Sequence, residues 1–181
     1  MSQARATALE ALLAEFRWTG VHADLAEVFR SAAFVASIGP ALAEPFEHAS
    51  VSAVVAIEAR GFVLGGLVAQ ALGVGVVLAR KPGAVHPGAI EELAAEPDWR
   101  GRRLTFGVSP LAVRPKDRLL LVEDWVETGS QARTVSSLIT RLGGSLVGVS
   151  AIVDHADPET RDELGLIGLL RSTDLPPFTG N

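Results

Sequence analysis

The sequence predicts an α/β fold with a doubly wound, mainly parallel sheet flanked by helices. Apolar runs at 51–57, 74–79 and 119–122 are typical of strands that are buried on both faces. The pattern strand–helix–strand occurs twice, over 51–79 and 119–153, and such units build parallel sheets. A length of 181 residues, 48% of them hydrophobic, is enough for one domain with a sizeable core, spanning 1–181.

The N-terminal residues 1–45 are expected to form a small hood of helices. Apolar residues at helical spacing predict an amphipathic helix over 5–16. A second helix is predicted over 24–37, with Asp24 as its N-terminal cap.

The segment 61–79 carries no charged residue and is long enough to span a membrane. The alternative is a buried helix over 61–72 followed by the strand at 74–79. Gly73 and Gly75 interrupt the segment, and its second half is rich in β-branched residues, which favours helix and strand. We therefore expect no membrane partner.

The second half of the chain is expected to complete the same sheet. Residues 82–103 combine prolines, glycines and charges and predict a long lid loop, with room for a short helix at 89–95. The other predicted elements are a strand at 104–108, a turn at 115–117, the strand at 119–122, a helix at 131–142 that stops at two glycines, a strand at 146–153 and a helix start at Asp157 and Pro158.

Composition narrows the classes of function. The net charge of −5 and the lack of a long basic run argue against nucleic acid as the partner. The chain has no cysteine, which excludes disulfides and thiolate chemistry. Arg5, Glu10 and Glu15 interrupt the apolar positions near the N-terminus, so we expect no signal peptide and a cytoplasmic location.

Acidic residues follow the strand at 119–122. Glu123 and Asp124 would lie at the carboxyl edge of the sheet, where open α/β folds bind ligands, and carboxylates there suit sugar hydroxyls and Mg²⁺. The next residues, 127–131, open a helix and predict a phosphate loop that is not a Walker A loop. The plainer alternatives are a solubilising strand end and an ordinary helix cap.

Cations follow the two earlier strands at the same predicted edge. Arg60, after the strand at 51–57, and Arg80 and Lys81, after the strand at 74–79, would suit a pyrophosphate. Each taken alone is more typical of a solvated strand end. Asp154 ends the strand at 146–153 and is either a site residue or an acid at a helix start.

Three blocks of sequence resemble the type I phosphoribosyltransferase family, and most closely its adenine phosphoribosyltransferases. They are Val-Val-Ala-Ile-Glu-Ala-Arg-Gly-Phe-Val-Leu-Gly at 54–65, Leu-Gly-Val-Gly-Val-Val-Leu-Ala-Arg-Lys-Pro-Gly at 72–83 and Leu-Val-Glu-Asp-Trp-Val-Glu-Thr-Gly at 121–129. The resemblance implies purine salvage by a dimer: a base displaces pyrophosphate from magnesium-bound 5-phosphoribosyl pyrophosphate (PRPP), giving a nucleoside monophosphate.

The resemblance also implies roles for individual residues. Glu123 and Asp124 would hold the ribose hydroxyls and Mg²⁺, and together with Glu127 they are the candidate catalytic residues. The 5′-phosphate would lie on Glu127, Thr128, Gly129, Ser130 and Gln131. The pyrophosphate would lie on Ala59, Arg60, Arg80 and Lys81. The base would lie against Phe16 and Arg17, with Trp125 and Asp154 as further candidates.

The chain departs from the adenine enzymes at several positions of the predicted site. Those enzymes usually have Asp at the position of Glu123, Ala at that of Glu127 and an aliphatic residue at that of Trp125. An acid at position 127 resembles the 6-oxopurine enzymes, in which it acts as a base near the purine. We therefore predict a purine phosphoribosyltransferase, adenine first, and keep two alternatives: another base, or a PRPP-sensing regulator without turnover.

Overall fold

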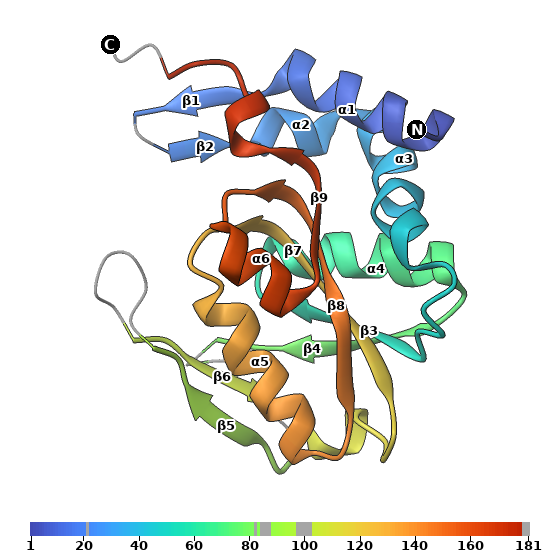
Figure 1. Cartoon of the computed structure of the whole chain (residues 1–181), viewed down its shortest axis with the longest axis vertical. Coiled ribbons are helices and arrows are strands. Elements are labelled where there is room, and N and C mark those ends of the chain that lie inside the picture. The colour runs from blue at the N-terminus through green and yellow to red at the C-terminus, as the bar shows by residue number, and fades with distance from the viewer. Residues whose placement is uncertain (21, 82, 84–87, 97–102, 179–181) are drawn as a thin grey trace.

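In the computed structural model, five parallel strands form the centre of the molecule. Their order is β4-β3-β7-β8-β9 (Figure 1). The strands are β3 (Ala53–Ile57), β4 (Gly75–Ala79), β7 (Arg118–Val126), β8 (Ser145–Asp154) and β9 (Leu166–Arg171). The structure describes residues 1–20, 22–81, 83, 88–96 and 103–178. The predicted parallel sheet is confirmed.

Alternating side chains of β7 enter two separate parts of the core. Leu120 and Val122 belong to the cluster that includes the hood and helix α4 (Arg60–Leu72), whereas Leu119 and Leu121 pack with residues of helix α5 (Ser130–Arg141). This period of two is the strand periodicity, and here both faces are covered. The central strand is therefore buried on both sides, as its apolar sequence predicts.

The uncharged segment 61–79 contains all of α4 except its first residue, Arg60, and then the strand β4. Gly73 ends the helix in the left-handed conformation, with φ of 70°. None of the helices that the structure describes is long and apolar enough to cross a membrane. The prediction of helix and strand for this segment is confirmed.

The hood covers one end of the sheet (Figure 1). It consists of α1 (Gln3–Glu15), the two-stranded sheet of β1 (Arg17–Thr19) and β2 (His22–Asp24), α2 (Ala26–Arg30), α3 (Ala32–Ala43) and the 3₁₀ turn η1 (Glu44–Phe46). Contacts of α3 with both α1 and α4 join the hood to the rest of the molecule.

The predicted single helix over 24–37 is wrong. Asp24 lies in β2, where its carboxylate accepts a hydrogen bond from the backbone N–H of Ala26 at 2.9 Å. The helix is broken at Ser31, which ends α2 and caps α3 by accepting a hydrogen bond from the N–H of Phe34 at 3.3 Å. Serine competes for backbone hydrogen bonds and so favours a cap over a helix interior.

The option of a short helix at 89–95 is also wrong. Residues Glu91–Ala94 form strand β5, which pairs antiparallel with β6 (Thr105–Val108). The backbone ladder to the predicted strand at 104–108 overrides the helix propensity of Glu, Leu and Ala. Residues 82, 84–87 and 97–102 of the predicted lid lie outside the described residues.

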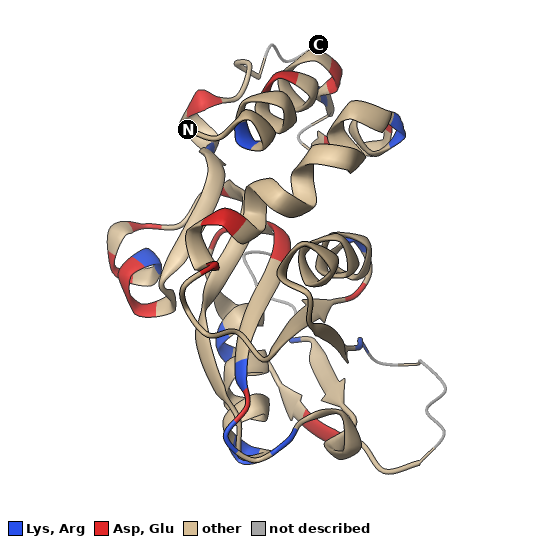
Figure 2. Cartoon of the chain, turned by 90° about the vertical axis from the view of Figure 1, so that its right-hand side faces the viewer, with Lys and Arg blue, Asp and Glu red and all other residues tan. Residues whose placement is uncertain are grey.

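Strand β7 is longer than the predicted 119–122. It continues through Glu123 and Asp124 to Val126, because the ladder with β8 continues to the pair Val126 and Asp154. The two acids therefore belong to the strand and do not follow it. The remaining elements are η2 (Pro110–Ala112), α6 (Pro158–Leu164) and η3 (Ser172–Asp174). Basic and acidic residues are both distributed over the described part of the chain (Figure 2).

Candidate active site

A cleft of about 290 Å³ lies at the carboxyl ends of β3, β4 and β7. This is the edge at which open parallel sheets bind their ligands. Its lining includes the predicted residues Ala59, Arg60, Lys81, Glu123, Asp124, Trp125, Glu127, Thr128, Gly129, Ser130 and Gln131. Glu58, Leu104, Val126 and Ala132 complete the lining. Segments far apart in the sequence thus meet around one cavity.

The two neighbouring acids of β7 have different surroundings. Glu123 is only 7% exposed, and burial, followed by the charge of Asp124, raises its pKa well above the ordinary value, with Lys81 and Arg60 acting in the opposite direction. Asp124 forms an ion pair with Arg60, at 2.8 Å between Oδ2 and the guanidinium. The cleft therefore contains a buried carboxyl that favours the neutral form and a paired carboxylate.

The segments that follow β3 and β4 are joined by Glu58. Its carboxylate accepts a hydrogen bond from the backbone N–H of Lys81 at 2.9 Å. Arg80 lies beside this contact but does not line the cleft. Its backbone exchanges two hydrogen bonds with Gly107, both at 2.9 Å, and its buried Nε has no hydrogen-bond partner among the described residues.

The predicted phosphate loop turns sharply at Gly129 and leads into α5. Gly129 has φ of 71°, and an added Cβ would lie 2.8 Å from Cγ2 of Thr160, so both conformation and space require glycine. The hydroxyl of Ser130 donates to the carbonyl of Glu96 at 2.7 Å. Gln131 has a buried Oε1 without a hydrogen-bond partner in the described part of the chain, so a ligand could satisfy it.

Aromatic rings connect the hood to the cleft. The ring of Trp125 lies 6.4 Å from that of Trp18 and 5.8 Å from that of His155, and Trp18 in turn lies 5.1 Å from Phe16. Phe16 and Arg17 do not line the cleft but a second cavity of about 440 Å³. Trp18 is a functional candidate that was not predicted, although the resemblance places its neighbours Phe16 and Arg17 with Trp125 at the base.

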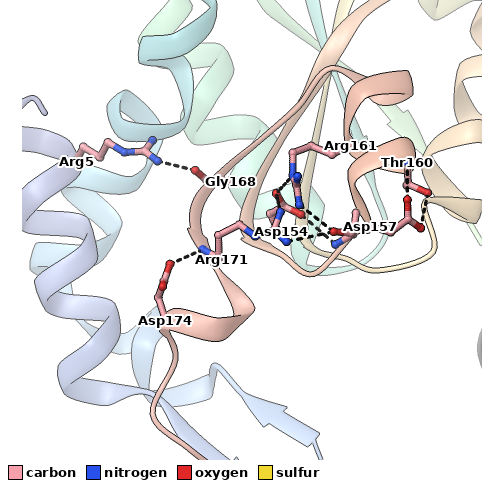
Figure 3. A network of polar contacts seen from close by, with 9 residues as sticks. Arg5, Asp154, Asp157, Thr160, Arg161, Gly168, Arg171 and Asp174 are labelled. Carbon is pink, nitrogen blue, oxygen red and sulfur yellow. Dashed lines mark hydrogen bonds and ion pairs between the residues drawn. The ribbon is translucent and has the colours of Figure 1, made fainter.

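Asp154 is held in a buried ion-pair network away from the cleft lining (Figure 3). Its Oδ2 accepts hydrogen bonds from Arg161 and Arg171, each at 2.7 Å, and its Oδ1 accepts one from the N–H of Ala156 at 3.0 Å. Both oxygens of this 3% exposed carboxylate are therefore engaged within the fold. We assign Asp154 a structural role and do not retain it as a ligand of the base.

The geometry agrees with what comparison with known proteins shows. The family described as "Phosphoribosyl transferase domain" matches residues 24–169. The chain belongs to the phosphoribosyltransferase family. It is similar to "Adenine phosphoribosyltransferase" of Jannaschia sp., with 34% identity over 133 residues (71% of this chain, 70% of the relative). The protein of that name from Escherichia coli is 35% identical over 140 residues (77% and 74%).

Solved structures show the same likeness to phosphoribosyltransferases. The adenine phosphoribosyltransferase of Rhodothermus marinus aligns with a TM-score of 0.79 and 29% identity, covering 92% of this chain and 99% of that one. The enzyme of that name from Thermoanaerobacter pseudethanolicus aligns with a TM-score of 0.80, 25% identity and coverage of 90% and 99%. The predicted family, fold and enzyme class are confirmed.

Proposed function

We propose that this phosphoribosyltransferase transfers the 5-phosphoribosyl group from PRPP to adenine and releases pyrophosphate and the nucleoside monophosphate. The observation that carries the proposal is the single cleft that unites the acids of β7, the loop 127–131 and the cations after β3 and β4. The relatives named adenine phosphoribosyltransferase favour adenine as the base.

Each part of the cleft suits one part of PRPP. The loop and the start of α5 present backbone N–H groups at a helix N-terminus, which suits the 5′-phosphate. Glu123 and Asp124 would accept hydrogen bonds from the ribose hydroxyls. Arg60 and Lys81 would hold the pyrophosphate, together with the backbone of Ala59. Arg60 is the more exposed partner of the ion pair with Asp124, since 52% of its side chain is exposed, and it could turn toward the pyrophosphate.

These residues would assist the displacement at C1 of the ribose through charge. The reacting sugar gains positive charge as pyrophosphate departs, and the carboxylate of Asp124 beside it would stabilise that charge. Arg60 and Lys81 would stabilise the negative charge that grows on the leaving pyrophosphate. A closed cleft would also exclude water that otherwise hydrolyses PRPP.

Mg²⁺ fits the donor set of this cleft. The described residues hold no cluster of three or more acidic, histidine or cysteine side chains that would form a metal site alone. Mg²⁺ commonly binds through one or two carboxylates and the oxygens of a phosphorylated substrate. Asp124 and, after loss of its proton, Glu123 would supply the carboxylates and PRPP the remaining oxygens. The bound ion would favour the deprotonated form of Glu123 and add charge stabilisation for the leaving pyrophosphate.

The base would lie beside Trp125, with Phe16 and Arg17 of the hood beyond it. Trp125 lines the cleft next to Glu127, and a planar indole offers a surface for stacking a purine. Glu127 is the feature that favours a 6-oxopurine as the alternative substrate, because its carboxylate lines the same cleft. Trp18 is expected to hold Trp125 in place through their edge-to-face contact.

A homodimer is proposed from the apolar surface at the edge of the sheet. Val63 of α4 and Val76 and Leu78 of β4 are 52%, 37% and 45% exposed. Val76 and Leu78 pair with Val54 and Ala56, which lie against Gly65 of α4, so these side chains face the same side of the sheet as α4. Such exposed apolar side chains on neighbouring elements suit a contact with a second copy. The cytoplasmic location stays a prediction.

Turnover with a panel of bases tests the proposal. The protein is incubated with PRPP and Mg²⁺ and with adenine, hypoxanthine, guanine or uracil, and pyrophosphate release is measured. We expect the highest kcat/KM with adenine. A preference for hypoxanthine or guanine would assign the chain to 6-oxopurines. The absence of pyrophosphate release with every base would contradict the proposed function.

A further inference from the structure

The loop 127–131 is fastened from behind by Arg133 of α5. One guanidinium nitrogen of Arg133 donates to the carbonyl oxygen of Thr128 at 2.6 Å. The other terminal nitrogen donates to Oγ1 of Thr160 at 3.0 Å, and Nε contacts both carboxylate oxygens of Glu163 at 3.0 and 2.9 Å. A single side chain therefore ties the loop backbone to two residues of α6.

Helix α6 is itself a fixed support. Asp157 caps it by accepting hydrogen bonds from the N–H of Thr160 at 2.8 Å and from its hydroxyl at 3.1 Å (Figure 3). Arg161 joins the helix to the buried Asp154 at 2.7 Å. A Cβ at Gly129 would approach Leu164 and Thr160 within 2.9 Å, so the loop already packs directly on this helix.

Arg133 does not lie where it could contact the phosphate directly. It does not line the cleft but a separate cavity of about 510 Å³. Its charge is balanced by Glu163, which raises the pKa of the Arg133 guanidinium through a side-chain hydrogen bond. Its role toward PRPP therefore has to pass through the carbonyl of Thr128.

We propose that Arg133 is a positioning residue that holds the loop 127–131 in the shape that receives the 5′-phosphate of PRPP. This inference rests on the proposed function. The bond to Thr128 fixes the peptide that immediately precedes Gly129, so it sets the direction of the N–H groups that follow. Backbone donors that are already oriented lose less entropy when an anion binds.

The relative strength of the contacts decides which variant is informative. Arg133 and Glu163 are 39% and 51% exposed, and exposed ion pairs contribute little because water screens them. Glu163→Gln keeps a side-chain oxygen as acceptor and is expected to change the KM for PRPP less than about threefold. Arg133→Met removes the charged donor to Thr128, and the KM for PRPP is expected to rise about tenfold.

The KM for the base separates positioning of the phosphate loop from a general loss of structure. In Arg133→Met the KM for adenine is expected to stay within about twofold, because the hood and Trp125 are not touched. Arg133→Lys still donates to a carbonyl, so its KM for PRPP is expected to lie between those of the wild type and of Arg133→Met. Arg141→Met is the matched control, since Arg141 lies on the same helix and makes one exposed ion pair, with Glu91 at 3.5 Å.

Hydrogen exchange of the amides of 128–133 tests, without PRPP, the clamp that Arg133 forms by binding the carbonyl of Thr128. We expect faster exchange in Arg133→Met than in the wild type and in Arg141→Met. Equal exchange in the two variants would overturn the clamp, as would an equal rise of the KM for PRPP and for adenine in Arg133→Met. If the wild type neither binds nor consumes PRPP, the proposed function fails, while the exchange measurement still decides whether Arg133 orders the loop.

Discussion

Asp124 is the residue on which the proposed chemistry depends most. Its carboxylate lines the cleft and pairs with Arg60, whereas Glu58 of the same cleft accepts a backbone hydrogen bond from Lys81. We expect Asp124→Ala to lower kcat about 100-fold or more, because a charge beside the reacting ribose is lost. Glu58→Ala is expected to lower it less than about tenfold. Steady-state rates with PRPP and adenine measure both, and equal small effects would contradict the assignment.

Glu123 is expected to make stability depend on pH. Burial raises its pKa well above 4.5, so the folded protein favours the neutral carboxyl and loses stability as pH rises from about 4.5 to the raised value. Glu123→Gln removes this loss. The variant should be more stable than the wild type at neutral pH, equally stable at low pH, and less active.

Urea unfolding at a series of pH values measures this difference. Glu10→Gln removes the same charge from an exposed position of α1 and serves as control. A wild-type stability that changes with pH no more steeply than that of Glu123→Gln would show that the buried carboxyl has no such effect.

If the substrate is a 6-oxopurine, Glu127 is expected to act as a base at the purine. Replacing it with glutamine keeps the size of the side chain but removes the proton acceptor. Turnover should then fall about 100-fold or more, and the pH–rate profile should change. Rates between pH 5 and 9 test this expectation, and an unchanged profile would remove Glu127 from the chemistry.

At the scale of elements, the turn from β7 into α5 carries the phosphate site. Gly129 and Gly20 both have positive φ, of 71° and 57°, but a Cβ at Gly20 would meet nothing within 4 Å. Gly20→Ala should therefore cost about 1–2 kcal/mol from backbone strain alone. Gly129→Ala adds a clash with Thr160, for about 1–3 kcal/mol more.

The unfolding free energies of the two variants, measured in urea, test whether the loop packs on α6 as described. We also expect the Gly129→Ala variant to bind PRPP more weakly, whereas Gly20→Ala should bind it normally. Equal destabilisation of the two variants would mean that α6 does not press against the loop.

The elements that sequence predicts best are those whose burial leaves a periodic pattern. Strands β3, β4 and β8 and helices α4 and α5 begin and end within two residues of their predicted limits. The C-terminal half of β7 was missed because acids interrupt the apolar run while the backbone ladder continues. The break at Ser31 was missed because a single serine interrupts an otherwise helical pattern.

The candidate site was predicted where neighbours in sequence are also neighbours in space. Glu123 to Gln131 form one continuous lining, so motif and cleft coincide. The shared edge of a parallel sheet also predicted that Arg60 and Lys81 lie near Glu123 and Asp124. Individual side-chain contacts between distant segments were not predictable from one sequence. Asp154 finds two arginines on α6 and β9, and Trp18 meets Trp125 across the boundary of the hood.

At the scale of the whole molecule, the exposed apolar surface of α4 and β4 predicts the oligomeric state. Val63→Glu introduces a charge into that surface and should shift the protein from dimer to monomer in sedimentation velocity experiments. Leu111→Glu is the matched control, because Leu111 is 96% exposed and belongs to η2 and to neither α4 nor β4. A wild type that is monomeric at all concentrations, or a Val63→Glu variant that remains dimeric, would contradict the proposed interface.

The proposed reaction of this cleft joins the ribose of PRPP to adenine. Phosphorus NMR of the protein with PRPP, Mg²⁺ and adenine tests it most directly, because donor and both products are seen together. We expect the PRPP signals to disappear while pyrophosphate and the nucleoside monophosphate appear in equal amounts. Persistence of PRPP, or pyrophosphate formed without the nucleotide, would contradict it.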